Sequence, residues 1–161
     1  MSLTLRDWQA LDDAGLAALH ALQIDPAQVE FAGTLERALA SCAKGPPEDI
    51  VGLVIEHGGT VVGFVVLQRA SRQPEWAPEG AAAVSAMRID RHRQGQGLGR
   101  AALAAVDDWL RQHWPQVAQV ALSVDDGNAA GRRAYALAGY TECAPARPGR
   151  IGLVRFLAKA L

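Results

Sequence analysis

The chain is organised around the stretch Ile89-Asp90-Arg91-His92-Arg93-Gln94-Gly95-Gln96-Gly97-Leu98-Gly99-Arg100-Ala101-Ala102-Leu103. An apolar run over residues 81–89 leads into it, three glycines follow at alternate positions, and residues 101–110 have the pattern of a helix. This order predicts an anion site, because glycines let a phosphate approach the backbone and the first amides of a helix point at it. Several cations in or beside the turn suit a ligand with multiple negative charges: Arg88, Arg91, His92, Arg93 and Arg100.

The spacing of the glycines excludes two common phosphate-binding motifs. The nucleotide-binding P-loop requires a lysine after its last glycine, and none follows here. The dinucleotide-binding fingerprint is Gly-x-Gly-x-x-Gly, whereas this chain has Gly-x-Gly-x-Gly. The alternative interpretation of the stretch is a flexible turn flanked by solvated arginines.

Length and composition limit the possible classes of protein. The 161 residues suit one domain, 1–161, which can bury a core of its own, and a net charge of −1 argues against a general nucleic-acid binder. Cys42 and Cys143 have no metal-ligand spacing, so we expect no metal site and a reduced, cytoplasmic protein. Residues 1–6 lack the apolar segment of a signal peptide, and no apolar run approaches the roughly 18 residues of a membrane span.

Apolar periodicity predicts alternating strands and helices. We expect strands over residues 3–5, 50–55, 61–67, 81–90, 117–124, 140–143 and 151–157. We expect helices after Asp12 and Asp13, over 29–42 with Thr34 as a possible cap, over 101–110 and over 129–138, while Asp25-Pro26 breaks the first. Residues 69–80 have the composition of a loop, and residues 145–150 that of a turn. The alternation favours an α/β protein with a mixed sheet.

Two motifs in this chain resemble those of the GCN5-related N-acetyltransferase (GNAT) superfamily. Gln94, Gly97 and Gly99 fit Gln/Arg-x-x-Gly-x-Gly/Ala, the family's pyrophosphate-binding motif. The segment Asn128-Ala129-Ala130-Gly131-Arg132-Arg133-Ala134-Tyr135-Ala136-Leu137-Ala138-Gly139-Tyr140 fits Asn-x-x-Ala-x-x-x-Tyr-x-x-x-Gly-Phe/Tyr, with glycine in place of the usual alanine. The resemblance covers roughly residues 51–157, and the N-terminal portion more weakly resembles the diamine and spermidine acetyltransferase branch.

The resemblance implies a fold and a co-substrate. The fold is a GNAT-type mixed, mostly antiparallel twisted sheet of about seven strands with flanking helices and splayed central strands. The co-substrate is acetyl-CoA, with no metal. By position, the backbone of Met87, Arg88 and Ile89 would bind the pantetheine arm and the acetyl carbonyl. Asn128 would bind the pantetheine amide as well as cap a helix, and either Arg132 or Arg133 could reach the ribose phosphate. The amides that would hold the pyrophosphate belong to Gln94, Gly95, Gln96, Gly97, Leu98, Gly99 and Arg100.

The same resemblance implies a general acid for the leaving thiolate but identifies no general base for the amine. Tyr135 occupies the position from which the family protonates the departing thiolate; its alternative role is a core aromatic. An alkylamine of pKa ~10.4 costs about 4–5 kcal/mol to neutralise at pH 7. Many relatives use a strand glutamate for this step, but Ser85 and Ser123 stand at the corresponding positions. The carboxylates that could act through water are Glu30, Glu75, Glu79 and Asp125.

The expected activity is N-acetylation of a primary amine of a small molecule, with a polyamine or diamine as one candidate acceptor. A polyamine site needs carboxylates, and the segments expected to cover the acceptor contain Asp25, Glu30, Glu36, Glu75 and Glu79. These residues could equally be ordinary surface carboxylates. Two alternatives stay open, namely acetylation of a protein N-terminus or lysine and a non-catalytic CoA-binding regulatory module. We expect no nucleic-acid or membrane partner, and the resemblance admits a homodimer, since dimers are common in the family.

Overall fold

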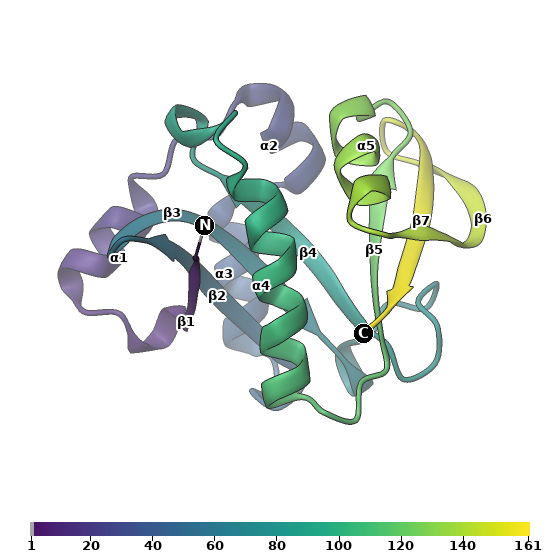
Figure 1. Cartoon of the computed structure of the whole chain (residues 1–161), viewed down its shortest axis with the longest axis horizontal. Coiled ribbons are helices and arrows are strands. Elements are labelled where there is room, and N and C mark those ends of the chain that lie inside the picture. The colour runs from purple at the N-terminus through teal and green to yellow at the C-terminus, as the bar shows by residue number, and fades with distance from the viewer. Residues whose placement is uncertain (1) are drawn as a thin grey trace.

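Residues 2–161, which the computed structural model describes, form a twisted seven-stranded sheet with helices on both faces (Figure 1). The strands are β1 (Thr4–Asp7), β2 (Ile50–His57), β3 (Thr60–Gln68), β4 (Ala82–Ile89), β5 (Gln119–Asp125), β6 (Thr141–Gly149) and β7 (Gly152–Ala160). They lie in the order β1-β2-β3-β4-β5-β7-β6, and all neighbours are antiparallel except β4 and β5. The predicted α/β class with a mixed, mostly antiparallel sheet is therefore confirmed.

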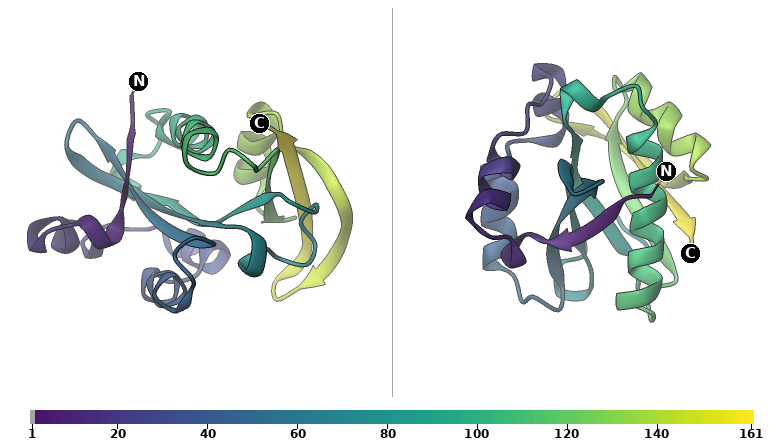
Figure 2. Two further views of the ribbon diagram at one scale, coloured as in Figure 1. Left: turned by 90° about the horizontal axis from the view of Figure 1, so that it is seen from below. Right: turned by 60° about the vertical axis from the view of Figure 1, so that its left-hand side comes forward.

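The helices form two layers. They are α1 (Asp13–His20), α2 (Pro26–Ala32), α3 (Leu35–Lys44), α4 (Leu98–His113) and α5 (Ala129–Leu137). The left panel of Figure 2 shows α4 and α5 on one face of the sheet and the first three helices on the other. No helix within residues 2–161 is both long enough and apolar enough to cross a membrane.

Each face of the sheet has its own apolar core. On one face, α4 buries a stripe that recurs every four residues and packs against the central strands: Leu98, Ala102, Val106 and Leu110. On the other face, Leu19 of α1 and Leu39 of α3 pack in a second cluster with Phe64 of β3. Full burial of such a side chain contributes roughly 1.5–3 kcal/mol, so both helical layers are held to the sheet mainly by apolar contact.

The predicted single helix over residues 29–42 is wrong, because two helices occupy this region. Gly33 adopts φ of 76°, a left-handed conformation that ends α2, and the side chain of Thr34 caps α3. The first helix ends at His20, before the predicted break at Asp25-Pro26, and Pro26 lies at the first turn of α2, behind the N-cap Asp25. Proline suits that position because a first-turn amide has no partner within the helix.

The predicted turn over residues 145–150 is also wrong. Strand β6 continues through Pro145 and Pro148, so the hairpin to β7 turns at Arg150 and Ile151. Within residues 2–161, strand β6 pairs with β7 alone and lies at the edge of the sheet. Proline is tolerated in such a strand because an edge residue can turn its nitrogen away from the neighbouring strand.

Candidate active site

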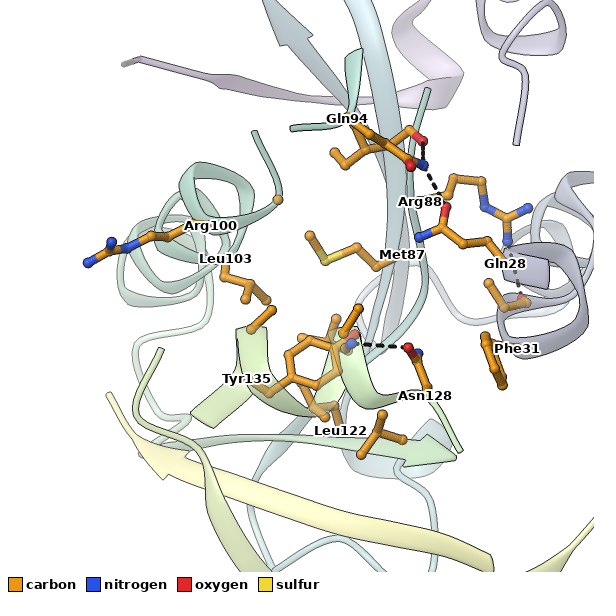
Figure 3. Close-up of a pocket in the computed structure, with 18 of the residues that line it drawn as sticks. Gln28, Phe31, Met87, Arg88, Gln94, Arg100, Leu103, Leu122, Asn128 and Tyr135 are labelled. Atoms are coloured by element: carbon orange, nitrogen blue, oxygen red, sulfur yellow. Dashed lines mark hydrogen bonds between the residues drawn. The ribbon is translucent and has the colours of Figure 1, made fainter. Parts of the chain in front are cut away.

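A cavity of about 600 Å³ opens where β4 and β5 separate. The two strands pair only over residues 82–84 and 120–122, and Ser85 and Ser123 lie where they diverge. The walls come from both strands, the glycine turn, the start of α4, and helices α2 and α5 (Figure 3). Crevices at the carboxyl ends of parallel strands are the usual place for ligands in open α/β sheets, so this cavity is the candidate active site.

A β-bulge lies at the point of divergence. The register of β3 with β4 shifts between Phe64 and Val66, so Ala86 and Met87 together oppose Val65. Ala86 has φ of 53°, a conformation that costs a residue other than glycine about 1–3 kcal/mol. Bulges re-aim side chains and end strand pairing near active sites, and here Met87 extends into the middle of the cavity (Figure 3).

The glycine turn presents a row of unpaired backbone amides. Gly97 precedes α4 in the left-handed conformation, with φ of 77°, and supplies no side-chain cap. Within residues 2–161, the amides of residues 95–100 donate to no carbonyl or side chain. A Cβ added at Gly95, Gly97 or Gly99 would meet no atom within 4 Å. Free amides at the start of a 16-residue helix, with open space before them, fit a pyrophosphate.

Arg88 does not join the cations at the turn. Its side chain is 2% exposed, and its guanidinium donates to the carbonyl oxygens of Ala86, Gly33 and Ala32 at 3.0, 3.0 and 3.2 Å. Burial lowers the pKa of Arg88, and the nearby Glu36 partly offsets this. Figure 3 shows the guanidinium directed to α2 and away from the glycine turn, so the side chain fastens α2 to β4.

Of the other predicted cations, two line the cavity and two do not. Arg93 and Arg100 line the cavity, although the guanidinium of Arg100 extends away from its centre in Figure 3. Arg91 and His92 are exposed and are not part of the lining. The backbone roles predicted for Met87, Arg88 and Ile89 remain compatible with the geometry, because all three residues line the cavity.

The side chains of Gln23 and Gln28 anchor the start of the glycine turn, and the sequence predicted no role for either residue. The side-chain amide of Gln94 donates to Oε1 of Gln28 on α2 at 3.0 Å and to the carbonyl of Ile89 at 3.4 Å. The imidazole of His92 lies 3.0 Å from Oε1 of Gln23. These contacts fix the segment before the glycines to the first helical layer.

Asn128 caps α5 and keeps a donor for the cavity. Its Oδ1 accepts a hydrogen bond from the amide of Gly131 at 3.0 Å, which confirms the predicted N-cap. Its NH₂ group donates to no residue within 2–161, and the side chain lines the cavity. An asparagine amide can serve both purposes, because the cap uses only the oxygen.

Tyr135 lines the same cavity from α5, beside Leu103 and Leu122 (Figure 3). The ring is half-buried, and its hydroxyl has no hydrogen-bond partner within residues 2–161. Burial raises the pKa of Tyr135 above its usual value, so the phenol carries its proton at neutral pH. A protonated, unengaged hydroxyl in a cavity can donate a proton to a ligand.

The predicted carboxylates are mostly remote. Asp125 lines this cavity, and Glu30 lines a second cavity of about 620 Å³ on the side of α2 and α3. Glu75 and Glu79 line neither one, and neither does Glu36. Asp25 is also outside both cavities and accepts a hydrogen bond from the amide of Ala27 as the cap of α2. Of the five carboxylates named for a polyamine site, only Glu30 lines a cavity, so the other four fit the alternative of ordinary surface carboxylates.

Comparison with known proteins gives the class of the chain. The model of the acetyltransferase (GNAT) family matches residues 16–140, so the chain belongs to this family of acyltransferases. No curated protein sequence matches it significantly. Among the residues described here, 2–161, no group of three His, Cys, Asp or Glu side chains could hold a metal ion.

Solved structures share the fold at low sequence identity. An aminoglycoside acetyltransferase in complex with coenzyme A is 18% identical, with a TM-score of 0.75 over 99% of this chain and 95% of that one. The spermidine N-acetyltransferase of Vibrio cholerae with coenzyme A and spermine is 18% identical, with a TM-score of 0.73 over 99% and 95%. An Escherichia coli N-acetyltransferase of a ribosomal-protein alanine is 23% identical, with a TM-score of 0.66 over 98% and 93%.

Proposed function

We propose that the protein uses acetyl-CoA to acetylate a primary amine of a small molecule by direct attack of the amine on the thioester. The proposal rests on one observation: Gly95 and residues 97–100, whose backbone amides are unpaired within residues 2–161, line the same cavity as Tyr135. A ligand with a diphosphate and a thioester needs both features of the cavity. The amides can bind the diphosphate, and the hydroxyl of Tyr135 can take part in the reaction of the thioester. The structural neighbours that contain coenzyme A share this fold, which supports the proposal.

Acetyl transfer forms a C–N bond and breaks the C–S bond of the thioester, and the departing thiolate then needs a proton. Tyr135 would supply it, because burial keeps its phenol protonated and a thiolate has a pKa near ~8.5. The backbone of Met87 to Ile89 would orient the pantetheine arm. The NH₂ group of Asn128 would bind a pantetheine carbonyl, since its oxygen is already used by the helix cap.

The attacking amine must lose a proton, and two carboxylates could receive it through water. Asp125 lines the cavity at the end of β5, and Glu30 lines the neighbouring cavity. Ser85 and Ser123 stand at the strand positions where many relatives have a glutamate, so proton removal here passes through solvent to one of these carboxylates. Neutralising the amine costs about 4–5 kcal/mol at pH 7 unless its pKa is lowered.

Thiol release from acetyl-CoA tests the proposal. We expect turnover with small amines, and we expect Tyr135→Phe to lower kcat about 10²–10⁴-fold, the usual contribution of a general acid. Calorimetry should show an unchanged affinity of the variant for acetyl-CoA. Turnover with only N-terminal or lysine peptides would favour protein acetylation instead. Tight binding of acetyl-CoA without transfer to any amine would favour a non-catalytic CoA-binding module.

A further inference from the structure

The second cavity adjoins the first at the bulge of β4. Its volume is about 620 Å³, and it shares four lining residues with the candidate active site: Phe31, Ala32, Ser85 and Ala86. The remaining lining comes from α2, α3, β3 and the turn between β6 and β7. An amine held in this second space could therefore reach the point where β4 and β5 diverge.

Two arginines dominate the charge of this cavity. Arg37 comes from the first turn of α3, and Arg150 comes from the turn between β6 and β7. Within residues 2–161, neither guanidinium forms an ion pair with a carboxylate. Arg150 donates through Nη2 to the main-chain oxygen of Glu30 at 2.5 Å, which positions it and leaves its other N–H groups for a ligand.

The rest of the lining provides little negative charge. Glu30 is the single acidic side chain among the lining residues within 2–161, and the other polar groups are neutral: Thr34, Ser41, Gln68 and Ser85. Ser85 is itself occupied, since its hydroxyl donates to Oε1 of Gln68 at 3.3 Å. A polyamine would bring a second ammonium group to two unpaired guanidinium groups, and this repulsion disfavours it as the acceptor.

We infer that the acceptor, if the proposed acetyltransferase function holds, is a primary amine that also bears an anionic group, a carboxylate or a phosphate. Arg37 and Arg150 bind the anion, because the planar guanidinium matches both groups with paired hydrogen bonds. The amino group lies toward Ser85 and the bulge. Glu30 complements the ammonium form before the proton leaves, so two positive charges and one negative charge in the lining match an acceptor of the opposite pattern.

Pairs of acceptors that differ only in the anion test the inference. An α-amino acid is compared with its primary amide, an aminoalkyl phosphate with the corresponding amino alcohol, and a diamine completes the panel. With the wild type we expect kcat/KM for an anionic member to exceed that for its neutral partner at least about tenfold, the scale of one charged hydrogen bond. The carboxylate and phosphate pairs separately show which anion is preferred.

The variants Arg37→Gln and Arg150→Gln assign the preference to this cavity. We expect each to raise KM for the anionic acceptor and to bring the ratio within each pair close to one, with unchanged affinity for acetyl-CoA. Arg111→Gln is the matched control, because Arg111 is exposed, pairs only with Asp108 within residues 2–161 and lines neither cavity. Thermal unfolding checks that all variants are folded.

Calorimetric titration of the same acceptors into the CoA-bound protein keeps this inference separate from the proposed function. Binding of the anionic acceptors that both variants weaken, without any thiol release, would refute catalysis and uphold the anion site. Equal or better use of the amides, amino alcohols or diamine by the wild type would overturn the inference while leaving acetyl transfer intact. Failure of every acceptor to bind would also overturn it, as would a preference that both variants retain.

Discussion

The rings of Tyr135 and Tyr140 meet edge to face, with centroids 5.9 Å apart and planes inclined by 65°. The amide of Tyr140 also donates to the carbonyl of Tyr135 at 3.0 Å, so the chain after α5 folds back on the helix. Gly139 permits this reversal with φ of 96°. Tyr140 thus supports the ring of Tyr135 from outside the cavity, since it is not part of the cavity lining.

Tyr140→Phe should stabilise the fold. The hydroxyl of Tyr140 is buried and has no hydrogen-bond partner within residues 2–161, so its removal relieves a desolvation cost. We expect a gain of about 1 kcal/mol in the free energy of unfolding and an unchanged kcat, because phenylalanine keeps the ring contact with Tyr135. Urea denaturation measures the gain, and a loss of stability would show that the hydroxyl has a partner.

The pH profile should test the raised pKa of Tyr135. Because burial raises the pKa of Tyr135, the phenol stays protonated below its ordinary value of about 10 and loses its proton only at still higher pH. Wild-type kcat, measured at saturating concentrations of both substrates, should therefore show no alkaline decrease up to about pH 10. A decrease centred well below that pH, present in the wild type and missing in Tyr135→Phe, would still assign the acid to Tyr135 but would contradict its raised pKa.

Gly99→Val should separate diphosphate binding from folding. A Cβ at Gly99 meets no atom within 4 Å, and its backbone is not left-handed, so the free energy of unfolding should change by no more than about 0.5 kcal/mol. The added methyl groups would occupy the space before the amides, and the Kd for CoA should rise at least about tenfold. S-acetyl-pantetheine, which lacks the diphosphate, is the control and should be used equally by both proteins. Equal loss with both substrates would argue against a diphosphate site here.

Arg88→Met should destabilise the protein. The buried guanidinium satisfies the carbonyls of Ala32, Gly33 and Ala86, and methionine would leave them without donors. We expect the free energy of unfolding to fall by about 2–3 kcal/mol, with faster amide hydrogen exchange in α2. Arg100→Gln, at an exposed position, should change it by less than about 0.5 kcal/mol. Equal effects of the two substitutions would refute the structural role of Arg88.

Long, regular patterns made part of the fold predictable. The β2–β3 hairpin and α4 follow from apolar runs and glycine turns close in sequence, and the structure confirms both. The split between α2 and α3 was not predictable, because both halves share a helical pattern and Gly33 adopts its left-handed conformation only in the folded chain. The extent of β6 was missed because Pro145 and Pro148 resemble turn residues until the edge position of the strand is known.

The candidate active site was also predictable only in part. The paired motifs predicted site roles for the glycines of the turn, Asn128 and Tyr135, and the structure places these residues along one cavity. The buried role of Arg88 could not be predicted, since an arginine that binds carbonyls from a distant helix has the same local sequence as one that faces solvent. Arg37 and Arg150 come from opposite ends of the chain, and only tertiary structure brings them to one cavity.

A crystal structure with acetyl-CoA bound tests the proposed acetyl transfer most directly. We expect diphosphate oxygens within about 2.7–3.2 Å of backbone nitrogens between Gly95 and Arg100. We also expect the hydroxyl of Tyr135 within hydrogen-bond reach of the thioester sulfur. A diphosphate bound elsewhere, or a phenol turned away from the sulfur, would refute the proposed acetyl transfer.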